Sequence, residues 1–372
     1  MEKCESCSRT EEKYKNKYGY LTILLIHVCR ATITNKKTPE KEEALHQLAK
    51  AANALLNADG GKLLIHVDGQ QKWDRDLEVL DEAIGKRFST LLHDGCQYCD
   101  YFSREWLSNV KSFEYADDFL LFGIAKINGV STLDSKTKMR NDFENVNAPC
   151  AVIATILQCC GDDETQHPSN IVPHTGIDDI PLHEDRATEL KSFPRQQEGA
   201  TVESVTNCIW NDLKLKHNIT SMAKLPRGGR FCIGIPETPY PGDYKTKTRQ
   251  KIGFHLRVDI NELIQSLDNK LKTDMLVLTG RGAFREAPSD LIAVHVYPIQ
   301  GTNKCVLSVN INHFNGIVFH DRAGPEVYTF ENGEICLMSN DIWLQRLLSF
   351  SRQPISTRGL MHRSPNFPRR HL

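Results

Sequence analysis

Two glutamates and a lysine that could take part in metal chemistry lie close together in the segment LHEDRATELKSF, residues 182–193. Glu184 and Glu189 are five positions apart, and Lys191 follows two positions later. Carboxylate oxygens are ligands that Mg²⁺ and Mn²⁺ prefer in proteins. Such ions promote phosphodiester hydrolysis by activating the attacking oxygen and stabilising charge on the phosphate and the leaving oxygen. A glutamate pair alone is commonplace on a solvated surface, so a metal site here needs a further acid and a scaffold.

Cysteine supplies a second possible metal chemistry. The pairs Cys4/Cys7 and Cys96/Cys99 each have the two-residue spacing that lets one turn give two thiolates to tetrahedral zinc. The pairs are 92 residues apart, so a joint structural Zn²⁺ site requires the N-terminus to fold back on the first half of the chain. A mobile N-terminal pair and a reduced loop pair are the alternatives.

The charge balance limits how the protein could bind nucleic acid. The chain has 46 basic and 47 acidic residues, so a surface that binds RNA has to be local. Candidate patches are a cluster of four residues and a basic C-terminal tail, although a solvated face or a loose tail fits both patterns. The cluster consists of Lys245, Lys247, Arg249 and Lys251. The basic residues of the tail are Arg352, Arg358, Arg363, Arg369 and Arg370.

The sequence gives no sign of a membrane anchor. The most apolar early segment, Tyr20–Ile33, contains His27 and Arg30 and is shorter than the roughly 18–20 apolar residues of a spanning helix, which favours a buried strand. The N-terminus does not resemble a secretory signal, and the twelve cysteines do not form a short secreted framework. We therefore expect a cytoplasmic protein in a reducing compartment.

An internal repeat organises the chain. GGKLLIHVDG (60–69) and GGRFCIGIPE (228–237) are 168 residues apart, and each reads as a glycine turn that needs positive φ, a basic residue and an apolar strand. A helix with apolar residues at helical spacing precedes the first copy and ends near Asn57. Further strands are expected at 117–127 and 289–299, and helices at 147–157 and 339–350. This order favours an α+β protein made of two related lobes over two unrelated domains.

The predicted domain boundaries follow from composition. Residues 1–19 form a polar N-terminal segment, 20–161 the first lobe, 162–181 a linker rich in Pro, Asp and Asn, and 182–352 the second lobe. Residues 353–372 form a basic tail that we expect to be disordered.

With this order of elements, the sequence resembles the core domain of the Schlafen family. ANALLNADGGKLLIHVD (52–68) is similar to the signature of the family's first lobe, and VSTLDSKTKMRNDFENVNAP (130–149) resembles the stretch that closes that lobe. In the second half, EDRATELKSF (184–193) is similar to the family's motif of two glutamates followed by Phe and Lys, and GGRFCIGIPE resembles the next strand, which ends in an acid. The resemblance covers about residues 20–350.

The resemblance implies two tandem lobes forming a horseshoe-shaped pseudo-dimer that grips folded RNA, with an endoribonuclease site in the second lobe. The family's three carboxylates would fall on Glu184, Glu189 and Glu237, holding Mg²⁺ or Mn²⁺, with Asp243 as a reserve ligand. We expect the glutamate pair on a helix, against the end of a strand that finishes at Glu237. Lys191 would balance the charge or contact the scissile phosphate, and a surface lysine is equally consistent with its position.

Departures from the family pattern leave a second function open. Pro236 stands where the family has an acid, and the second-lobe zinc site of many Schlafens is expected to be absent because only Cys305 remains there. The leading prediction is a metal-dependent endoribonuclease that cuts structured or precursor RNA, including tRNA-like and small-RNA precursors. The alternative is a non-catalytic or partly catalytic subunit of a small-RNA (piRNA-type) precursor-processing complex, binding RNA and other Schlafen-like subunits. A third is an RNA-binding scaffold.

Overall fold

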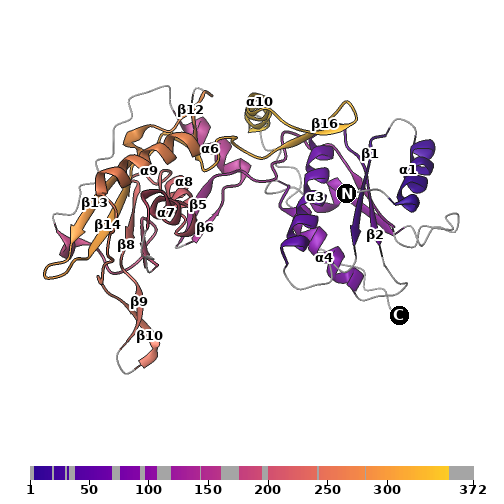
Figure 1. The fold of residues 1–372 in the computed structure, drawn as a ribbon. Helices are drawn as coiled ribbons and strands as arrows, with labels where there is room; N and C mark the ends of the chain where they lie inside the picture. The colour runs from indigo at the N-terminus through magenta and orange to yellow at the C-terminus, as the bar shows by residue number, and fades with distance from the viewer. Residues whose placement is uncertain are drawn as a thin grey trace, which may run out of the picture.

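The computed structural model describes residues 4–18, 21–29, 32, 38–68, 76–92, 97–106, 119–142, 144–160, 176–194, 200–240, 243–280 and 282–351. The protein is α+β, as expected, and has two four-stranded sheets among several smaller ones. Figure 1 shows these two sheets in separate bodies on either side of the helices α6 and α10. We call residues 4–160 the first lobe and residues 176–351 the second lobe.

The first sheet has the strand order β1-β2-β4-β3. Its strands are β1 (Ile23–Cys29), β2 (Gly61–Asp68), β3 (Phe102–Trp106) and β4 (Phe119–Ile124). β1 and β2 run parallel, whereas β4 is antiparallel to both of its neighbours. The first lobe also contains α1 (Glu5–Tyr18), α3 (Pro39–Asn57), α4 (Asp76–Ser89) and α5 (Tyr98–Tyr101). The strand predicted within 20–33 is therefore β1, and that within 117–127 is β4.

Helix α3 makes the parallel crossover from β1 to β2, and its limits follow from local chemistry. The Thr38 side chain accepts a hydrogen bond from the Lys41 backbone N–H, and Pro39 occupies the first turn, where a missing N–H costs nothing. The helix ends at Asn57, and Gly60 adopts a φ of +79° in the turn into β2. The apolar face of α3 packs on β2 and β4 in the core of the first lobe.

The second sheet repeats the first. Its strands are β7 (Thr188–Lys191), β8 (Gly229–Ile233), β13 (Ile292–Pro298) and β14 (Cys305–Ile311), in the order β7-β8-β14-β13. β7 and β8 run parallel and β14 is antiparallel to both of its neighbours, as in the first sheet. The crossover from β7 to β8 contains α7 (Val202–Asn207), the π-helix η3 (Cys208–Asp212) and α8 (Leu215–Met222). Gly228, at a φ of +68°, takes the place of Gly60 in the turn into the second strand.

Each sheet is followed by a hairpin and a helix, which pack across the molecule. After the first sheet these are β5 (Lys138–Asn141), β6 (Glu144–Asn147) and α6 (Cys150–Cys159). After the second they are β16 (Tyr328–Glu331), β17 (Glu334–Leu337) and α10 (Asn340–Ser351). The β5–β6 hairpin packs on α8 of the second lobe, and β16–β17 packs on α3 of the first. Hydrogen bonds fasten these contacts, among them those from Lys138 N to Thr220 Oγ1 at 3.1 Å and from Tyr328 N to Asn53 Oδ1 at 2.7 Å.

Helices α6 and α10 pack together between the lobes. Trp343 of α10 is fully buried there, and its Nε1–H donates to Thr132 Oγ1 at 3.0 Å. The remaining elements of the second lobe are α9 (Ile260–Asp274), η2 (Ile177–Asp179), η4 (Ser289–Leu291), a three-stranded sheet and a hairpin. The sheet consists of β11 (Leu276–Thr279), β12 (Phe284–Glu286) and β15 (Gly316–Phe319), and the hairpin of β9 (Glu237–Tyr240) and β10 (Asp243–Arg249).

The structure bears on the expected N-terminal segment, linker and tail to different extents. Residues 5–18 form helix α1, which packs against β1, so the N-terminal segment belongs to the first lobe instead of standing apart from it. The linker expected at 162–181 lies largely outside the described residues, but Ile180 is buried against the second lobe. The tail at 353–372 is outside them as well. Among the described residues, no helix is long and apolar enough to cross a membrane.

Candidate functional site

The glutamate pair does not lie on a helix, which corrects the expectation from the sequence. Glu184 is in the loop before β7, and Glu189 is the second residue of that strand. The segment forms a strand because Thr188 to Lys191 pair in parallel with Arg230 to Ile233 of β8. The alternation of side chains along a strand then places Leu190 in an apolar cluster on one face and Glu189 on the opposite face.

Glu189 is buried between two cations. Its Oε2 accepts a hydrogen bond from Arg140 Nη1 at 2.9 Å, and its Oε1 forms an ion pair with Lys191 Nζ. The Arg140 side chain is fully buried, whereas that of Lys191 is 34% exposed. Lys191 therefore forms an ion pair with Glu189 in this structure.

Arg140 comes from the first lobe, on strand β5. Its guanidinium also donates to the backbone carbonyls of Asp185 and Arg186, both at 3.2 Å, and lies 3.4 Å from Asn218 Oδ1. A single side chain of the first lobe thus fixes both the Glu189 carboxylate and the loop that contains Glu184. Nothing in the local sequence around Arg140 indicates this contact, because the residues it joins are more than forty positions away.

Glu184 is held separately. Its Oε1 accepts a hydrogen bond from the Leu190 backbone N–H at 3.0 Å, and its Oε2 accepts one from Arg249 Nη2 at 2.7 Å. Arg249 also donates to the Leu190 carbonyl oxygen. The Glu184 and Arg249 side chains are 21% and 17% exposed, so this pair lies at the surface of the site.

Glu237 does not end the β8 strand, which corrects a second expectation. β8 stops at Ile233, because Gly234 takes a φ of +102° and Pro236 cannot donate to a sheet ladder. Glu237 instead begins β9, opposite Arg249 of β10. The side chains of Glu237 and Asp243 lie outside the described residues. Among the described carboxylates, no three come within coordination reach of one another.

The basic cluster at 245–251 lies on and beside a hairpin that projects from the second lobe (Figure 1). The base of the hairpin is tied to the acidic segment through Arg249 and Glu184. Lys251 follows β10, and its Nζ donates to the Asp178 carbonyl oxygen at 2.8 Å. Lys245 and Lys247 are on β10, but their side chains are outside the described residues.

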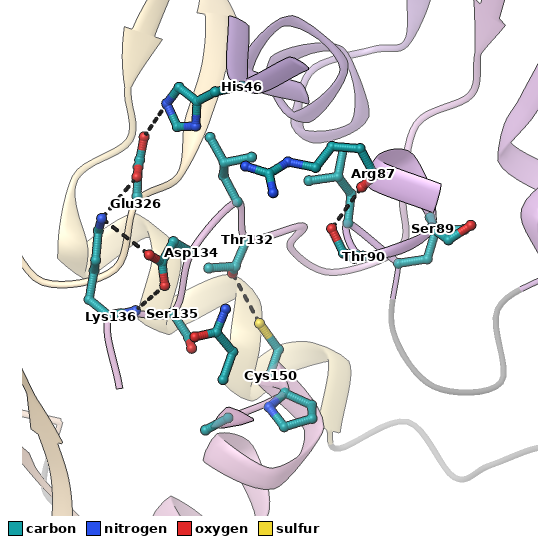
Figure 2. Close-up of a pocket in the computed structure, with 16 residues that line it drawn as sticks. His46, Arg87, Ser89, Thr90, Thr132, Asp134, Ser135, Lys136, Cys150 and Glu326 are labelled. Carbon is teal, nitrogen blue, oxygen red and sulfur yellow. Dashed lines mark hydrogen bonds and ion pairs between the residues drawn. The ribbon is translucent and has the colours of Figure 1, made fainter. Parts of the chain in front are cut away.

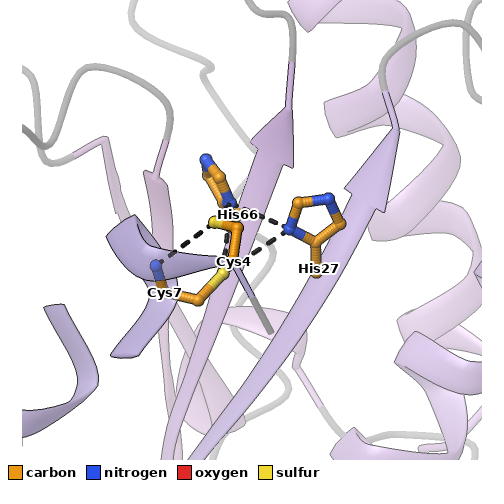
Figure 3. A group of neighbouring side chains, drawn as sticks. All are labelled: Cys4, Cys7, His27 and His66. Carbon is orange, nitrogen blue, oxygen red and sulfur yellow. Dashed lines mark hydrogen bonds between the residues drawn. The ribbon is translucent and has the colours of Figure 1, made fainter. Parts of the chain in front are cut away.

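A group of four side chains in the first lobe could bind a metal ion. It consists of Cys4, Cys7, His27 and His66, whose ligand atoms all lie within 4.8 Å of one another (Figure 3). His27 and His66 are register partners on the parallel strands β1 and β2. Cys4 precedes α1 and Cys7 lies in its first turn. The prediction that Cys4 and Cys7 contribute to a metal site is supported, and the group is compatible with a structural zinc ion.

Cys99, from the second cysteine pair of the prediction, is not part of this group. Cys99 is exposed and lies just before β3. β3 begins opposite Ile124 of β4, and Ile124 in turn lies opposite Gly61 of β2. His66 is five residues farther along β2, so about 16 Å of strand separates the two positions. Cys96 is outside the described residues. The histidines were missed because the strand pairing that joins residues 27 and 66 cannot be read from spacing.

The surroundings of His66 hold its ring in place. The imidazole stacks on Phe119 with ring centroids 4.4 Å apart and an interplanar angle of 12°. Burial, with a smaller contribution from His27, lowers the pKa of His66, which favours the neutral ring that can bind a metal. His27 has an acidic neighbour: its Nε2 lies 3.9 Å from Asp68 Oδ2.

A cavity of about 620 Å³ lies where the lobes meet (Figure 2). On one wall, Lys136 Nζ is 3.2 Å from Asp134 and 3.1 Å from Glu326, and His46 Nε2 is 3.2 Å from the same Glu326. Burial raises the pKa of Cys150, another lining residue, to about 11, so its thiol is not an activated nucleophile. The charged side chains on this wall are paired with one another, and the pairs with Glu326 join the two lobes.

Comparisons with known proteins add little to this geometry. No protein-family model matches the sequence, and no curated protein is significantly similar to it. Among solved structures, the chain is similar to the DIP2311 protein from Corynebacterium diphtheriae, with 15% identity and a TM-score of 0.22. That match covers 41% of this chain and only 25% of DIP2311. A likeness of this size carries no argument, so the resemblance to Schlafen proteins stays a prediction.

Proposed function

We propose that this chain is a Schlafen-type RNA-processing protein whose second lobe takes part in divalent-metal-dependent cleavage of structured or precursor RNA. One observation carries the proposal: the two four-stranded sheets have the same strand order and pairing directions, and each is followed by a hairpin and a helix. Each lobe's hairpin packs on the other lobe, as exchanged elements do in a domain-swapped dimer, which supports a pseudo-dimer of two related lobes. A horseshoe of such lobes is the architecture that the resemblance implies.

The acidic segment could perform this chemistry if its cations change partners. Glu184 and Glu189, with Glu237 as the third acid, would hold Mg²⁺ or Mn²⁺, which supplies activation of the attacking oxygen and stabilisation of charge on the phosphate. Lys191 and Arg249 are partly exposed, so both can turn from the carboxylates towards a phosphate oxygen. Buried Arg140 keeps its hydrogen bonds and holds the segment in position. A zinc ion at the Cys/His group would lie in the other lobe and take no part in cleavage.

The projecting hairpin offers a route for RNA to this segment. Lys245 and Lys247 are on β10, whose last residue, Arg249, contacts Glu184. A phosphate backbone that binds along the hairpin would therefore be led towards the glutamates. Because this contact is electrostatic and local, RNA binding should weaken as salt concentration rises.

Cleavage assays with the full-length chain test the proposal. Structured and precursor-like RNAs would be incubated with Mn²⁺, with Mg²⁺ and with a chelator, and the products would be resolved on denaturing gels. We expect metal-dependent nicking that Glu189→Gln abolishes, since the amide keeps the shape of the side chain but is a poor metal ligand. Glu203→Gln, at an exposed position of α7, is the matched control. Cleavage at the wild-type rate by the Glu189→Gln protein would exclude the assigned site.

The ion pairs favour a second candidate, a non-catalytic or partly catalytic subunit of a small-RNA precursor-processing complex. Both described glutamates of the pair already have cationic partners, as structural carboxylates do. In that case the chain alone binds RNA without cutting it, and activity appears only with other Schlafen-like subunits. Native mass spectrometry of the protein purified from its own cells would identify such partners. Reconstitution with Glu189→Gln then shows whether this chain supplies an essential carboxylate to the complex.

A further inference from the structure

We propose that Cys4, Cys7, His27 and His66 bind one Zn²⁺ in a closed tetrahedral site that fastens helix α1 to the outer face of the first sheet. This proposal is independent of RNA cleavage, because the group lies in the first lobe and the acidic segment in the second. A zinc site in this place also differs from the joint site with Cys96 and Cys99 that the cysteine spacing suggests.

Four of the six ligand-to-ligand distances in the group are similar to, or slightly shorter than, the edges of a zinc tetrahedron. His66 Nδ1 is 3.1 Å from Cys7 Sγ, 3.5 Å from Cys4 Sγ and 3.0 Å from His27 Nδ1, and Cys7 Sγ is 3.5 Å from His27 Nδ1. Bond lengths of about 2.3 Å to sulfur and about 2.0–2.1 Å to nitrogen give tetrahedral edges of about 3.3–3.8 Å. Figure 3 shows both Nδ1 atoms and both sulfurs directed at one another.

The donor set selects the metal and its role. Two thiolates and two neutral imidazoles neutralise a divalent ion, which suits the buried positions of Cys7 and His66. Soft sulfur disfavours Mg²⁺, Ca²⁺ and Mn²⁺, whereas zinc takes this combination readily. Because the chain supplies all four ligands, the site leaves no open position for substrate and is structural.

Separate parts of the fold prepare these ligands. The parallel register of β1 and β2 sets His27 beside His66 on one face, and the stack on Phe119 fixes the His66 ring. The Cys7 backbone N–H points to Cys4 Sγ at 3.4 Å, and both sulfurs lie at the N-terminal end of α1, where the helix dipole favours thiolates. With Nδ1 on the metal, the Nε2–H of His27 faces the nearby Asp68 carboxylate, which is the usual support for a metal-bound imidazole.

Helix α1 has a physical need for such a fastening. Seven of its fourteen residues are charged, and among its described side chains the buried apolar ones are Cys7 and Tyr14. Tyr14 packs with Leu64 and Phe119 in a small cluster between α1 and the sheet. So small an apolar contact provides little docking energy. A zinc ion would join the start of α1 to β1 and β2, and its binding free energy would supply the remaining docking energy.

Metal analysis of the untagged full-length chain tests the assignment. We expect about one zinc per chain by inductively coupled plasma mass spectrometry in the wild type. Cys7→Ser and His27→Ala should lose it, whereas the matched control Cys99→Ser should retain it. Substitution with Co²⁺ should give the visible absorption of a tetrahedral thiolate site.

A second measurement needs only the wild-type protein, so it holds even if the variants fail to fold. With zinc bound, Cys4 and Cys7 should resist alkylation, as read by peptide mass spectrometry, and a strong chelator should expose both. The chelator should also release α1 to trypsin at Lys13, Lys15 and Lys17. If hydrogen bonds alone held the group, the chelator would change neither the alkylation of the cysteines nor the cleavage of α1 by trypsin. Zinc that depends on Cys99 but not on Cys7, or alkylation of Cys4 and Cys7 that a chelator does not change, would overturn the proposal.

Discussion

Arg140 offers the sharpest test of how the lobes depend on each other. Its fully buried guanidinium donates to Glu189 Oε2 at 2.9 Å and to two backbone carbonyls of the acidic segment. We consider Arg140→Met, which keeps most of the volume of the side chain and removes the charge and every donor. Glu189 then has Lys191 as its remaining described cation, and the two carbonyls lose this donor.

The size of the effect follows from the burial of the pair. Removing one partner of a buried ion pair typically costs about 3–5 kcal/mol of stability. Because Lys191 still pairs with Glu189, we expect the lower end of that range, about 3 kcal/mol. With a urea dependence of about 3 kcal/mol per molar, the unfolding midpoint should fall by about 1 M. Arg249→Met, which breaks the partly exposed pair with Glu184, should cost about 1 kcal/mol or less.

Urea unfolding followed by far-UV circular dichroism and tryptophan fluorescence measures both variants. A third variant, Arg140→Met combined with Glu189→Met, should recover part of the loss, since two apolar side chains leave no unpaired buried charge. Equal unfolding midpoints for Arg140→Met and Arg249→Met would refute the reasoning. A double variant that is clearly less stable than Arg140→Met alone would refute it as well.

Three further outcomes are expected. Trp343→Ala should cost about 3–5 kcal/mol in urea unfolding, because a fully buried indole between the lobes is lost. Burial lowers the pKa of Lys224 to about 7. Between pH 7 and the ordinary pKa range of lysine, the unfolded chain therefore binds more protons than the folded one, and the free energy of unfolding rises with pH. Lys224→Met should flatten that rise in urea unfolding measured across this pH range. Gly228→Ala would put a methyl group 2.0 Å from the Ile311 carbonyl oxygen and should sharply lower the melting temperature, whereas Gly301→Ala, also at positive φ but in open space, should lower it by far less.

Local sequence patterns predicted the helices and strands that have clear local signals. Apolar spacing and the stop at Asn57 and Gly60 located α3. The helix expected at 339–350 is α10, at whose start the Ser339 hydroxyl accepts a hydrogen bond from the Ile342 N–H. The glycine turns at 60 and 228 do adopt positive φ. These features depend on a few neighbouring residues, so a single sequence contains enough information to find them.

The sites were less predictable because they depend on long-range pairing. The glutamate pair was expected on a helix, but the edge position beside β8 makes a strand of only four residues, too short for an alternating pattern to show. His27 and His66 join Cys4 and Cys7 through strand register. No spacing rule covers that kind of contact.

The register of the two sheets explains why the lobes carry different chemistry. Lys62 pairs with Ile23 in the first sheet and Arg230 with Thr188 in the second, so alignment of the two glycine turns places Leu24 where the second lobe has Glu189. The two hairpins also differ, with a charged residue in one where the other has an aromatic one. Arg140 pairs with Asn145 in the first hairpin, and the aligned pair in the second is Phe330 with Ile335.

The same structural place is therefore apolar in one lobe and ionic in the other. Leu24 packs against the apolar core of the first lobe, whereas Glu189 binds Arg140 in the second. The aligned positions of His27 and His66 are Ser192 and Gly234, which cannot form the Cys/His group. A buried carboxylate is tolerated only where the opposite lobe's hairpin provides a cation, so an acidic site at this position is confined to the second lobe.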